Sequence, residues 1–295
     1  MRLRNLSLRD KAVFARHLSQ ERHELSVYAF ANIYIWKALF CIQWAVIEDS
    51  LCVFFKDKIG CFLYLAPLGK KNPEVIKKAF AITDSFNKNK EISRIENVEE
   101  KDVPFYRNLG LWCKEKSCDY LCERSDLAKL QGDKFKSKRA CYNYFVKHYD
   151  FEYLPFSLKY GDDCLKLYNR WMRERKNADP IYQGMLADSK RCLGTGLPDY
   201  KGLDLVGRIV KVDNKIKGFT FGYKLNSNTF CILYEITDLS IKGLAQFIFR
   251  EFCRELKDYK YINIMDDSGL ENLKKVKLSY RPLKLIPAYI ASRKN

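Results

Sequence analysis

The chain has 295 residues, of which 47% are hydrophobic and 14% aromatic, so it is long enough for two globular domains with sizeable cores. Its 53 Lys and Arg against 36 Asp and Glu leave a net charge of +17. That charge favours polyanionic partners, namely RNA, DNA or anionic lipid headgroups, without choosing among them. The hydrophobic content excludes an intrinsically disordered chain.

Eleven cysteines are scattered through apparent strands and helices, and no secretory signal precedes them. We therefore expect reduced thiols in a cytoplasmic protein. Cys113, Cys118 and Cys122 lie close together, but no second Cys or His pair stands at zinc-finger spacing. The favoured interpretation is buried small hydrophobic residues, and no metal site is predicted.

The longest apolar stretch, 33–47, contains Lys37 and Gln43 and is shorter than the roughly 20 residues that span a bilayer. No transmembrane segment is predicted. The basic residues leave open a peripheral contact with the inner face of a membrane.

Local signals define the elements of the first half. Asn72, Pro73 and Glu74 are a cap residue, a proline at the first helical position and an acid in the first turn, which predict a helix that runs to about Phe86. In chain order we expect a helix over 8–18, a buried loop or short helix over 26–36, strands over 43–47, 51–55 and 60–66, the helix over 73–86, a strand over 92–95, a helix over 99–108 closed by Gly110, strands over 111–114 and 119–122, and a short helix from Ser125.

A basic segment at 132–149 is predicted to be an amphipathic helix. Its apolar face is expected to carry Phe135, Tyr142, Val146 and Tyr149. The opposite face would present Lys136, Arg139 and Asn143, and Lys138 with Arg139 is expected to contact a polyanion. A solvated basic face with no ligand is the ordinary alternative.

The sequence of the second half predicts a further helix, a loop, an antiparallel meander of three strands and a βαβ unit. The expected elements are a helix over 165–175, a loop over 190–200, strands over 205–212, 216–223 and 229–235, a helix that begins at Gly243, and a buried strand over 261–265 parallel to the third. Gly243, Leu244 and Ala245 at the helix start are expected to leave backbone N–H groups open to a phosphate or another anion. A tight strand-to-helix turn is the alternative reading of the same glycine.

The two halves share an order of elements at an offset of about 169 residues, which predicts two copies of one fold. We expect a mixed α/β architecture in which each domain has a mostly antiparallel sheet with one βαβ unit. The domains are predicted over 1–131, as scaffold, and 132–295, with the active site. Three histidines lie away from the predicted site and are given no catalytic role.

In this order the segments resemble the phosphatidylglycerol lysyltransferase C-terminal family (DUF2156-like), a tandem of GNAT acyltransferase folds, over nearly the whole chain. The residues that carry the resemblance are Gly132 with Lys138-Arg139 and Asn143-Tyr144-Phe145, Gly218-Phe219-Thr220-Phe221-Gly222 with Leu225-Asn226, Glu235, Ile262-Asn263, Asp267, Gly269, Leu273-Lys274-Lys275, Lys277 and Ser279-Tyr280-Arg281-Pro282.

The resemblance implies a transferase that takes an amino acid from aminoacyl-tRNA and joins it to an acceptor such as a lipid headgroup, with no other cofactor. Glu235 and Asp267 follow two neighbouring strands, so they are expected to orient an α-amino group or accept a proton. Tyr280 is a candidate oxyanion donor, and Asn226 and Asn263 are expected among the substrate-binding residues. The alternatives are an N-cap or surface acid for the two carboxylates, and simple packing for the Tyr280 ring.

The chain departs from the family pattern at several polar positions. Ile236 stands where the family has Lys, Ile264 and Met265 where it has an Arg-Glu pair, and Ala140 where it has Asn. These changes favour a second hypothesis, a tRNA- or anion-binding protein without turnover. A third, transfer from acyl-CoA, expects Arg or Gln where the chain has Ser240.

Overall fold

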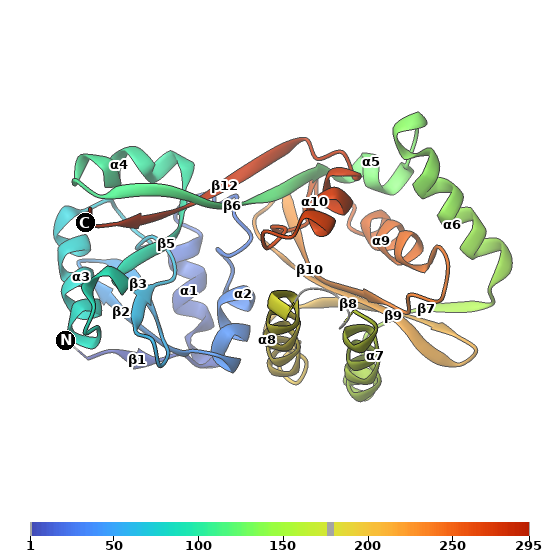
Figure 1. Ribbon diagram of the computed structural model, residues 1–295, viewed down its shortest axis with the longest axis horizontal. Helices are drawn as coiled ribbons and strands as arrows, with labels where there is room; N and C mark the ends of the chain where they lie inside the picture. Colours follow the sequence, from blue (N-terminus) through green and yellow to red (C-terminus); the bar gives the residue numbers. More distant parts are fainter. Residues whose placement is uncertain (1, 176–179, 295) are drawn as a thin grey trace. The chain divides into compact units, whose positions relative to one another are not determined.

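The computed structural model describes residues 2–175 and 180–294 and divides into two compact units (Figure 1). Unit 1 comprises Met1–Asp119, Asp266–Gly269 and Leu285–Asn295, and unit 2 comprises Tyr120–Met265 and Leu270–Lys284. The division by contacts thus falls at Asp119 and assigns the C-terminal strand to unit 1. The predicted boundary between the two copies of the fold, between residues 131 and 132, stays a prediction.

The strands of unit 1 follow the spatial order β1, β2, β3, β4, β5, β12. Their bounds are β1 Arg4–Asn5, β2 Cys41–Ile47, β3 Ser50–Lys56, β4 Cys61–Leu63, β5 Arg94–Glu99 and β12 Lys284–Ser292. All neighbours are antiparallel except β4 and β5, which pair in parallel with Leu63 opposite Ile95. The crossover between these two is α3 (Pro73–Phe86), so unit 1 contains the predicted βαβ unit.

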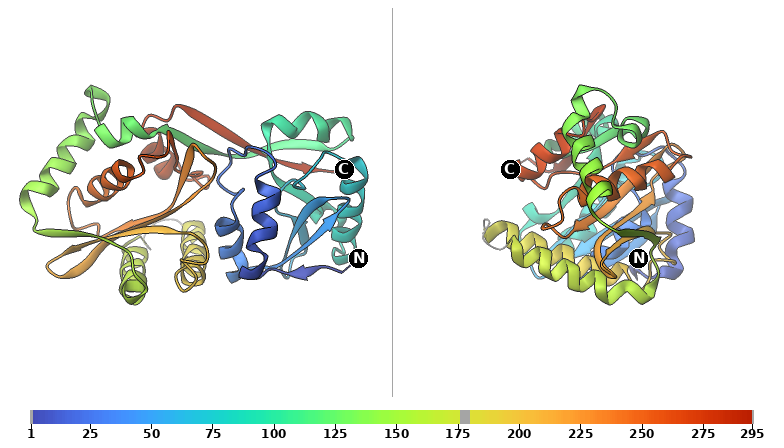
Figure 2. Two further views of the ribbon diagram at one scale, coloured as in Figure 1. Left: turned by 180° about the vertical axis from the view of Figure 1, so that it is seen from behind. Right: turned by 90° about the vertical axis from the view of Figure 1, so that its right-hand side faces the viewer.

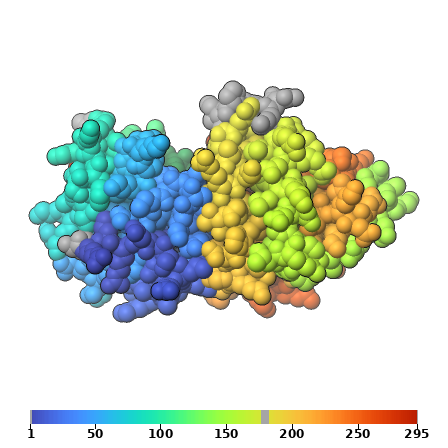
Figure 3. All heavy atoms as spheres, turned by 90° about the horizontal axis from the view of Figure 1, so that it is seen from below, coloured from blue at the N-terminus to red at the C-terminus, as the bar shows by residue number. Residues whose placement is uncertain are grey.

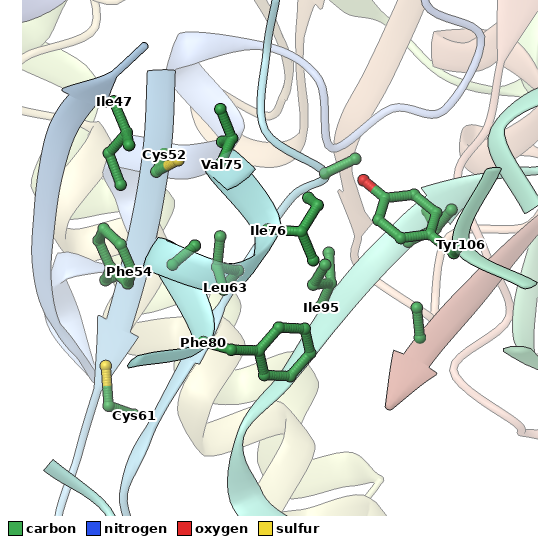
Figure 4. Packing of buried hydrophobic residues seen from close by; sticks show 14 of the residues in the cluster. Ile47, Cys52, Phe54, Cys61, Leu63, Val75, Ile76, Phe80, Ile95 and Tyr106 are labelled. Atoms are coloured by element: carbon green, nitrogen blue, oxygen red, sulfur yellow. The ribbon is translucent and has the colours of Figure 1, made fainter. Parts of the chain in front are cut away.

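Helix α3 begins where the sequence predicts, because the Asn72 side chain accepts a hydrogen bond of 2.9 Å from the Glu74 N–H. Its apolar face lies on the sheet: Val75, Ile76 and Phe80 pack with strand residues that include Phe54 and Ile95 (Figure 4). The other helices of unit 1 are α1 Lys11–Leu18, α2 Phe30–Ile35 and α4 Val103–Asn108, with 3-10 turns at Leu8–Asp10, Trp36–Ala38, Lys90–Ile92 and Glu100–Asp102.

The strands of unit 2 follow the order β6, β11, β10, β9, β8, β7. Their bounds are β6 Trp112–Glu123, which begins in unit 1, β7 Phe151–Pro155, β8 Val206–Val212, β9 Lys215–Lys224, β10 Thr229–Thr237 and β11 Tyr261–Asn263. Only β10 and β11 are parallel. The crossover between them is α9 (Leu244–Glu255), which repeats the arrangement of unit 1.

Helices cover both faces of the unit 2 sheet (Figures 1 and 2). On one face α6 (Lys136–His148) and α9 pack through Phe145 and Phe247 against Val210. On the other, α7 (Gly161–Glu174) and α8 (Pro180–Gly196) pack against Ile209, the neighbour of Val210 on β8. Figure 3 shows the outer side of α7 and α8, in green and yellow. The remaining elements are α5 Arg124–Lys129, α10 Glu271–Leu278 and 3-10 turns at Asp133–Phe135 and Leu158–Tyr160.

Two sequence expectations differ from the structure, and several elements were not expected. The strands expected over 111–114 and 119–122 are one strand, β6. The loop expected over 190–200 is largely the C-terminal part of α8, because Leu186, Leu193 and Leu197 recur at helical spacing and are buried. Two glycines in that stretch suggested a loop, but Gly194 has only open space beside it and is tolerated in the helix. Helix α10 and the strands β1, β7 and β12 were not predicted.

Candidate functional site

The carboxyl end of β10 extends beyond its parallel neighbour. β10 and β11 pair over three positions that end at Cys231 opposite Asn263, whereas β10 continues to Thr237. After β11 the chain turns towards β6, where the Ile264 N–H donates to the Tyr120 carbonyl at 3.0 Å. Beyond Cys231, therefore, β10 pairs in the described part of the chain with β9 alone. Strands that diverge in this way leave room for ligands at their carboxyl ends.

A β-bulge determines which face of the sheet receives Glu235. Ile232 lies opposite Gly222 and Tyr234 opposite Phe221, so Leu233 is an extra residue in β10. Phe230 packs on Phe252 of α9, with ring centroids 5.7 Å apart. In a regular strand Tyr234, four residues after Phe230, would project from the same face of the sheet. Its hydroxyl instead donates to the Ser189 carbonyl of α8, on the opposite face, at 3.1 Å.

The reversal turns Glu235 towards the α6 and α9 side. Its carboxylate acts electrostatically on Cys253 of α9 and on Tyr280. Lys138 of α6 and Lys277 of α10 act on the carboxylate in turn. We call Glu235, Lys138, Lys277 and Tyr280 the Glu235 cluster; its members come from β10, α6, α10 and the residues after α10.

Burial dominates the electrostatics of the Glu235 carboxyl, which lies half-buried at the strand end. Loss of solvation raises its pKa from 4.5 to about 8, although the charges of Lys138 and Lys277 both oppose the rise. The carboxylate makes no hydrogen bond to any of the described residues. Glu235 is therefore a group that exchanges a proton near neutral pH, which is typical of functional sites.

Lys138 is held beside the aromatic ring of Tyr280. Its Nζ donates to the Ser279 Oγ at 2.8 Å and lies 3.6 Å from the centroid of the Tyr280 ring. Burial lowers the pKa of Lys138, and the negative charge of Glu235 opposes that effect. Lys138 therefore points into the protein from the first half of α6, with its position fixed by two partners.

Tyr280 both packs and faces the cluster. Its ring lies 4.4 Å from the ring of Phe249 of α9, and only 8% of the residue is exposed. Burial, together with the charge of Glu235, raises its pKa well above 10.0. The hydroxyl therefore keeps its proton at neutral pH and can only donate or share it.

Lys277 enters the cluster from the other side, because its Nζ donates to the Ile264 carbonyl just beyond β11. Two thiols are close enough to interact with the cluster: burial raises the pKa of Cys122 to about 12, and that of Cys253 is also raised mainly by burial. Both thiols stay protonated and unreactive at neutral pH. Lys277 and Ser279 carry the family resemblance, yet sequence reasoning gave neither a role in the site.

The basic helix differs from its predicted amphipathic pattern. Lys136 and Asn143 are exposed as expected, but Val146, predicted for the packed face, is 43% exposed. Arg139 is half-buried, and its Nη1 donates to the carbonyls of Leu130 and Gly132. Arg139 thus closes the loop before α6, and its expected contact with a polyanion stays a prediction.

The other predicted polar residues stabilise turns. Asp267 lies in unit 1 and accepts a hydrogen bond of 2.9 Å from the Gly269 N–H. Asn263 is fully buried at the end of β11, and its Oδ1 accepts from the Met265 N–H at 2.7 Å. Asn226 accepts from the Asn228 N–H before β10 begins, at the opposite end of that strand from Glu235. The structure does not bring Asn226 to the Glu235 cluster.

The start of α9 packs closely on α6. Gly243 has φ of +86°, and a Cβ there would lie 2.1 Å from the Cys141 carbonyl oxygen of α6. Leu244 is fully buried, and its N–H donates to the Ile241 carbonyl. The glycine is therefore required for the turn and for the contact between the helices. Ala245 is half-buried, and an anion at this helix start stays a prediction.

No cluster of three His, Cys, Asp or Glu that would hold a metal ion occurs in residues 2–175 and 180–294. The same residues include no helix that is long and apolar enough to cross a membrane.

Comparison with known proteins gives a family. The family model described as "Phosphatidylglycerol lysyltransferase, C-terminal" matches residues 19–292, nearly the whole chain and all of the Glu235 cluster. No curated protein matches.

Three solved structures share the fold. A conserved protein of unknown function from Bacteroides thetaiotaomicron VPI-5482 is 29% identical with a TM-score of 0.89, and the alignment covers 99% of each chain. L-PGS from Bacillus licheniformis is 16% identical with a TM-score of 0.66, over 97% of this chain and 92% of that one. A tandem GNAT protein from the clavulanic acid biosynthesis pathway is 8% identical with a TM-score of 0.52, over 100% and 99%. The predicted tandem GNAT-like fold is confirmed, and the chain belongs to the phosphatidylglycerol lysyltransferase C-terminal family.

Proposed function

We propose that this protein is an aminoacyltransferase that moves an amino acid from aminoacyl-tRNA to a hydroxyl or amine acceptor, with the Glu235 cluster as its active site. The observation that carries the proposal is the raised pKa of Glu235, about 8, at the open carboxyl end of β10. A general base works best when its pKa lies near the working pH. The net charge of +17 fits a polyanionic donor.

The chemistry needs three groups, which the cluster supplies. The acceptor oxygen or nitrogen attacks the ester carbonyl carbon, and its proton passes to the Glu235 carboxylate. The bond between the carbonyl carbon and the ester oxygen then breaks, and the Glu235 carboxyl returns the proton to that oxygen, which leaves as a hydroxyl of the tRNA ribose. We assign the Lys138 ammonium and the Tyr280 hydroxyl as donors to the oxyanion that forms on the carbonyl oxygen. No covalent enzyme intermediate is required. The part of β10 that pairs only with β9 would receive the aminoacyl end of the donor.

The charge of the cluster also bears on the amino acid that is carried. With a pKa of about 8, Glu235 is mostly neutral at pH 7, whereas Lys138 and Lys277 bring two ammonium groups. A lysyl side chain would add another cation to a half-buried site, which like charges disfavour. We therefore propose a neutral or acidic amino acid as the transferred group. We also propose a lipid headgroup as one class of acceptor, and the cytoplasmic face of a membrane as the location of the protein.

The test is a transfer assay with a matched control. Purified protein is incubated with tRNAs carrying labelled alanine, glutamate or lysine, with acyl-CoAs as a separate donor class, and with lipid and peptide acceptors. We expect label to leave neutral or acidic aminoacyl-tRNA, and Glu235→Gln to lower that rate about 100-fold or more. Glu271→Gln, at a side chain that is 76% exposed, should leave the rate unchanged. Equal rates for Glu235→Gln and wild type would refute the assignment.

A second function is favoured by two apolar residues that are close to the site along the chain. Ile236 follows Glu235 but packs with Leu193 on the opposite face of the sheet, and the Ile264 carbonyl accepts a hydrogen bond from Lys277. Ile236 is 5% and Ile264 8% exposed, and both stand where the family pattern has charged residues. An anion-binding protein without turnover would keep Lys138 and Lys277 and dispense with those charges. Binding of tRNA in the same assay with no transfer from any donor would support this function over the transferase.

A further inference from the structure

Helix α10 and the residues after it present an unusual surface. Val276 is 53%, Leu278 40% and Leu283 60% exposed, three aliphatic side chains within eight residues. Lys274 and Lys275, directly before Val276, and Arg281, between Leu278 and Leu283, are also exposed. We call these six residues, which all belong to unit 2, the α10 surface.

The charge of this segment is strongly one-sided. Residues 270–284 contain five basic side chains and one acidic side chain, Glu271. The Glu271 carboxylate lies 3.7 Å from the Lys274 Nζ, and the Lys274 and Glu271 side chains are 49% and 76% exposed. A pair so exposed neutralises little of the surrounding field. The α10 surface therefore combines aliphatic groups with a positive potential.

The packing of α10 shows which side is free. Leu273 and Lys277, four residues apart and so on one side of the helix, are half-buried, and none of the residues of α10 is fully buried. Directly after the helix, Tyr280 is buried against Phe249 and anchors the segment to α9. The face with Lys274, Lys275 and Leu278 points away from these contacts.

We propose that the α10 surface docks onto an anionic lipid bilayer. Exposed aliphatic side chains interspersed with Lys and Arg are the composition that enters the boundary between headgroups and acyl chains, where the aliphatic groups leave water and the cations meet lipid phosphates. A nucleic acid would use the cations but would gain little from Val276, Leu278 and Leu283, because it offers flat bases that favour aromatic partners.

The docking surface and the Glu235 cluster share one helix. Lys277, on the inner side of α10, donates to the Ile264 carbonyl and lowers the pKa of Glu235 against the effect of burial. A bilayer that holds the outer side of α10 would thus also hold the position of a cation in the cluster. The docking itself does not depend on the proposed transfer reaction.

The test is co-sedimentation of the full chain with vesicles of phosphatidylcholine, with or without phosphatidylglycerol or phosphatidylserine. We expect binding to both kinds of anionic vesicle and weak binding to phosphatidylcholine alone. Lys274→Gln with Lys275→Gln should weaken binding about tenfold or more, since each basic residue near an anionic surface contributes a several-fold factor. Val276→Ser with Leu278→Ser should weaken it at constant charge.

A matched control lies in unit 1, where Ile59 is 77% exposed beside Lys58 in the turn between β3 and β4. Lys58→Gln with Ile59→Ser removes one cation and one aliphatic group elsewhere and should leave vesicle binding unchanged. Circular dichroism confirms that each variant is folded. The proposal fails if the wild-type protein does not bind anionic vesicles, or if the α10 variants bind them as tightly as wild type does. It also fails if those variants lose affinity for tRNA alone.

Discussion

The buried carboxyl of Glu235 should make the stability of the protein depend on pH. Its pKa in the folded chain is about 8, against an ordinary value of 4.5. Between these pH values the unfolded chain releases a proton that the folded chain retains, so the free energy of unfolding falls as pH rises. Below about pH 4.5 this carboxyl does not lower the free energy of unfolding, and above about pH 8 it lowers that free energy by the full amount.

The magnitude follows from the size of the pKa change. At about 1.4 kcal/mol per pH unit, a rise from 4.5 to about 8 corresponds to roughly 5 kcal/mol as an upper bound. Because Glu235 is half-buried rather than fully buried, we expect about 2–5 kcal/mol. Glu235→Gln removes the titrating group. The free energy of unfolding of the variant minus that of wild type should therefore be larger at pH 9 than at pH 5 by this amount.

The assay is urea-induced unfolding of wild type and Glu235→Gln, followed by circular dichroism at several values between pH 5 and pH 9. Glu271→Gln is the control, since that side chain is 76% exposed and should give a difference that stays flat with pH. If the stability difference between wild type and Glu235→Gln also stays constant, Glu235 titrates at an ordinary pH, and its assignment as a base near neutrality loses its basis.

Three further predictions concern the same unit. Lys277→Met removes a charge that lowers the pKa of Glu235, so the rising limb of the transfer rate against pH should move upwards by about one pH unit; an unmoved limb would contradict the electrostatic link. Asp238→Asn should destabilise the protein by about 1–3 kcal/mol in urea unfolding at pH 7. Burial alone would raise the pKa of Asp238, but Lys217, Ser240 and Arg170 lower it to about 2, so its contribution is present above pH 4 and lost as pH falls towards 2. Gly243→Ala should cost about 2–4 kcal/mol, because its Cβ would meet the Cys141 carbonyl at 2.1 Å and φ is +86°, whereas Gly184→Ala, with open space beside it in α8, should be neutral or stabilising.

Local signals in the sequence were sufficient for much of the fold. The helix from Pro73 to Phe86 and the parallel partner of β10 were predicted from a cap, a proline and an apolar run, since each of these acts within a few residues. By contrast, β12 pairs with β5 through Ala291 and Ile95, which are far apart in the sequence. Periodicity along one segment contains no information about such a partner.

The candidate site was predicted only in part for a related reason. Glu235 was identified because it stands at the end of the strand predicted over 229–235, and in the structure it lies two residues before the end of β10. Lys277 lies on a helix with no fully buried residue, where its own pattern is that of a solvated surface. Its role depends on a contact with the Ile264 carbonyl, which only the folded chain creates. Lys138 was expected to meet a polyanion, yet its Nζ lies between Ser279 and Tyr280.

The single extra residue in β10 links the fold to the proposed chemistry. In a regular strand Tyr234 and Phe230 would share a face, and Glu235 would then project towards α7 and α8. That side is filled by Tyr168, Leu193 and Phe219, so a carboxyl there would be buried among apolar side chains. The insertion of Leu233 moves Glu235 to the face on which Lys138 offsets part of the cost of burial. The bulge is therefore what converts an unfavourable buried acid into a group with a pKa near neutrality, and the face that Glu235 occupies is the condition on which the transferase proposal rests.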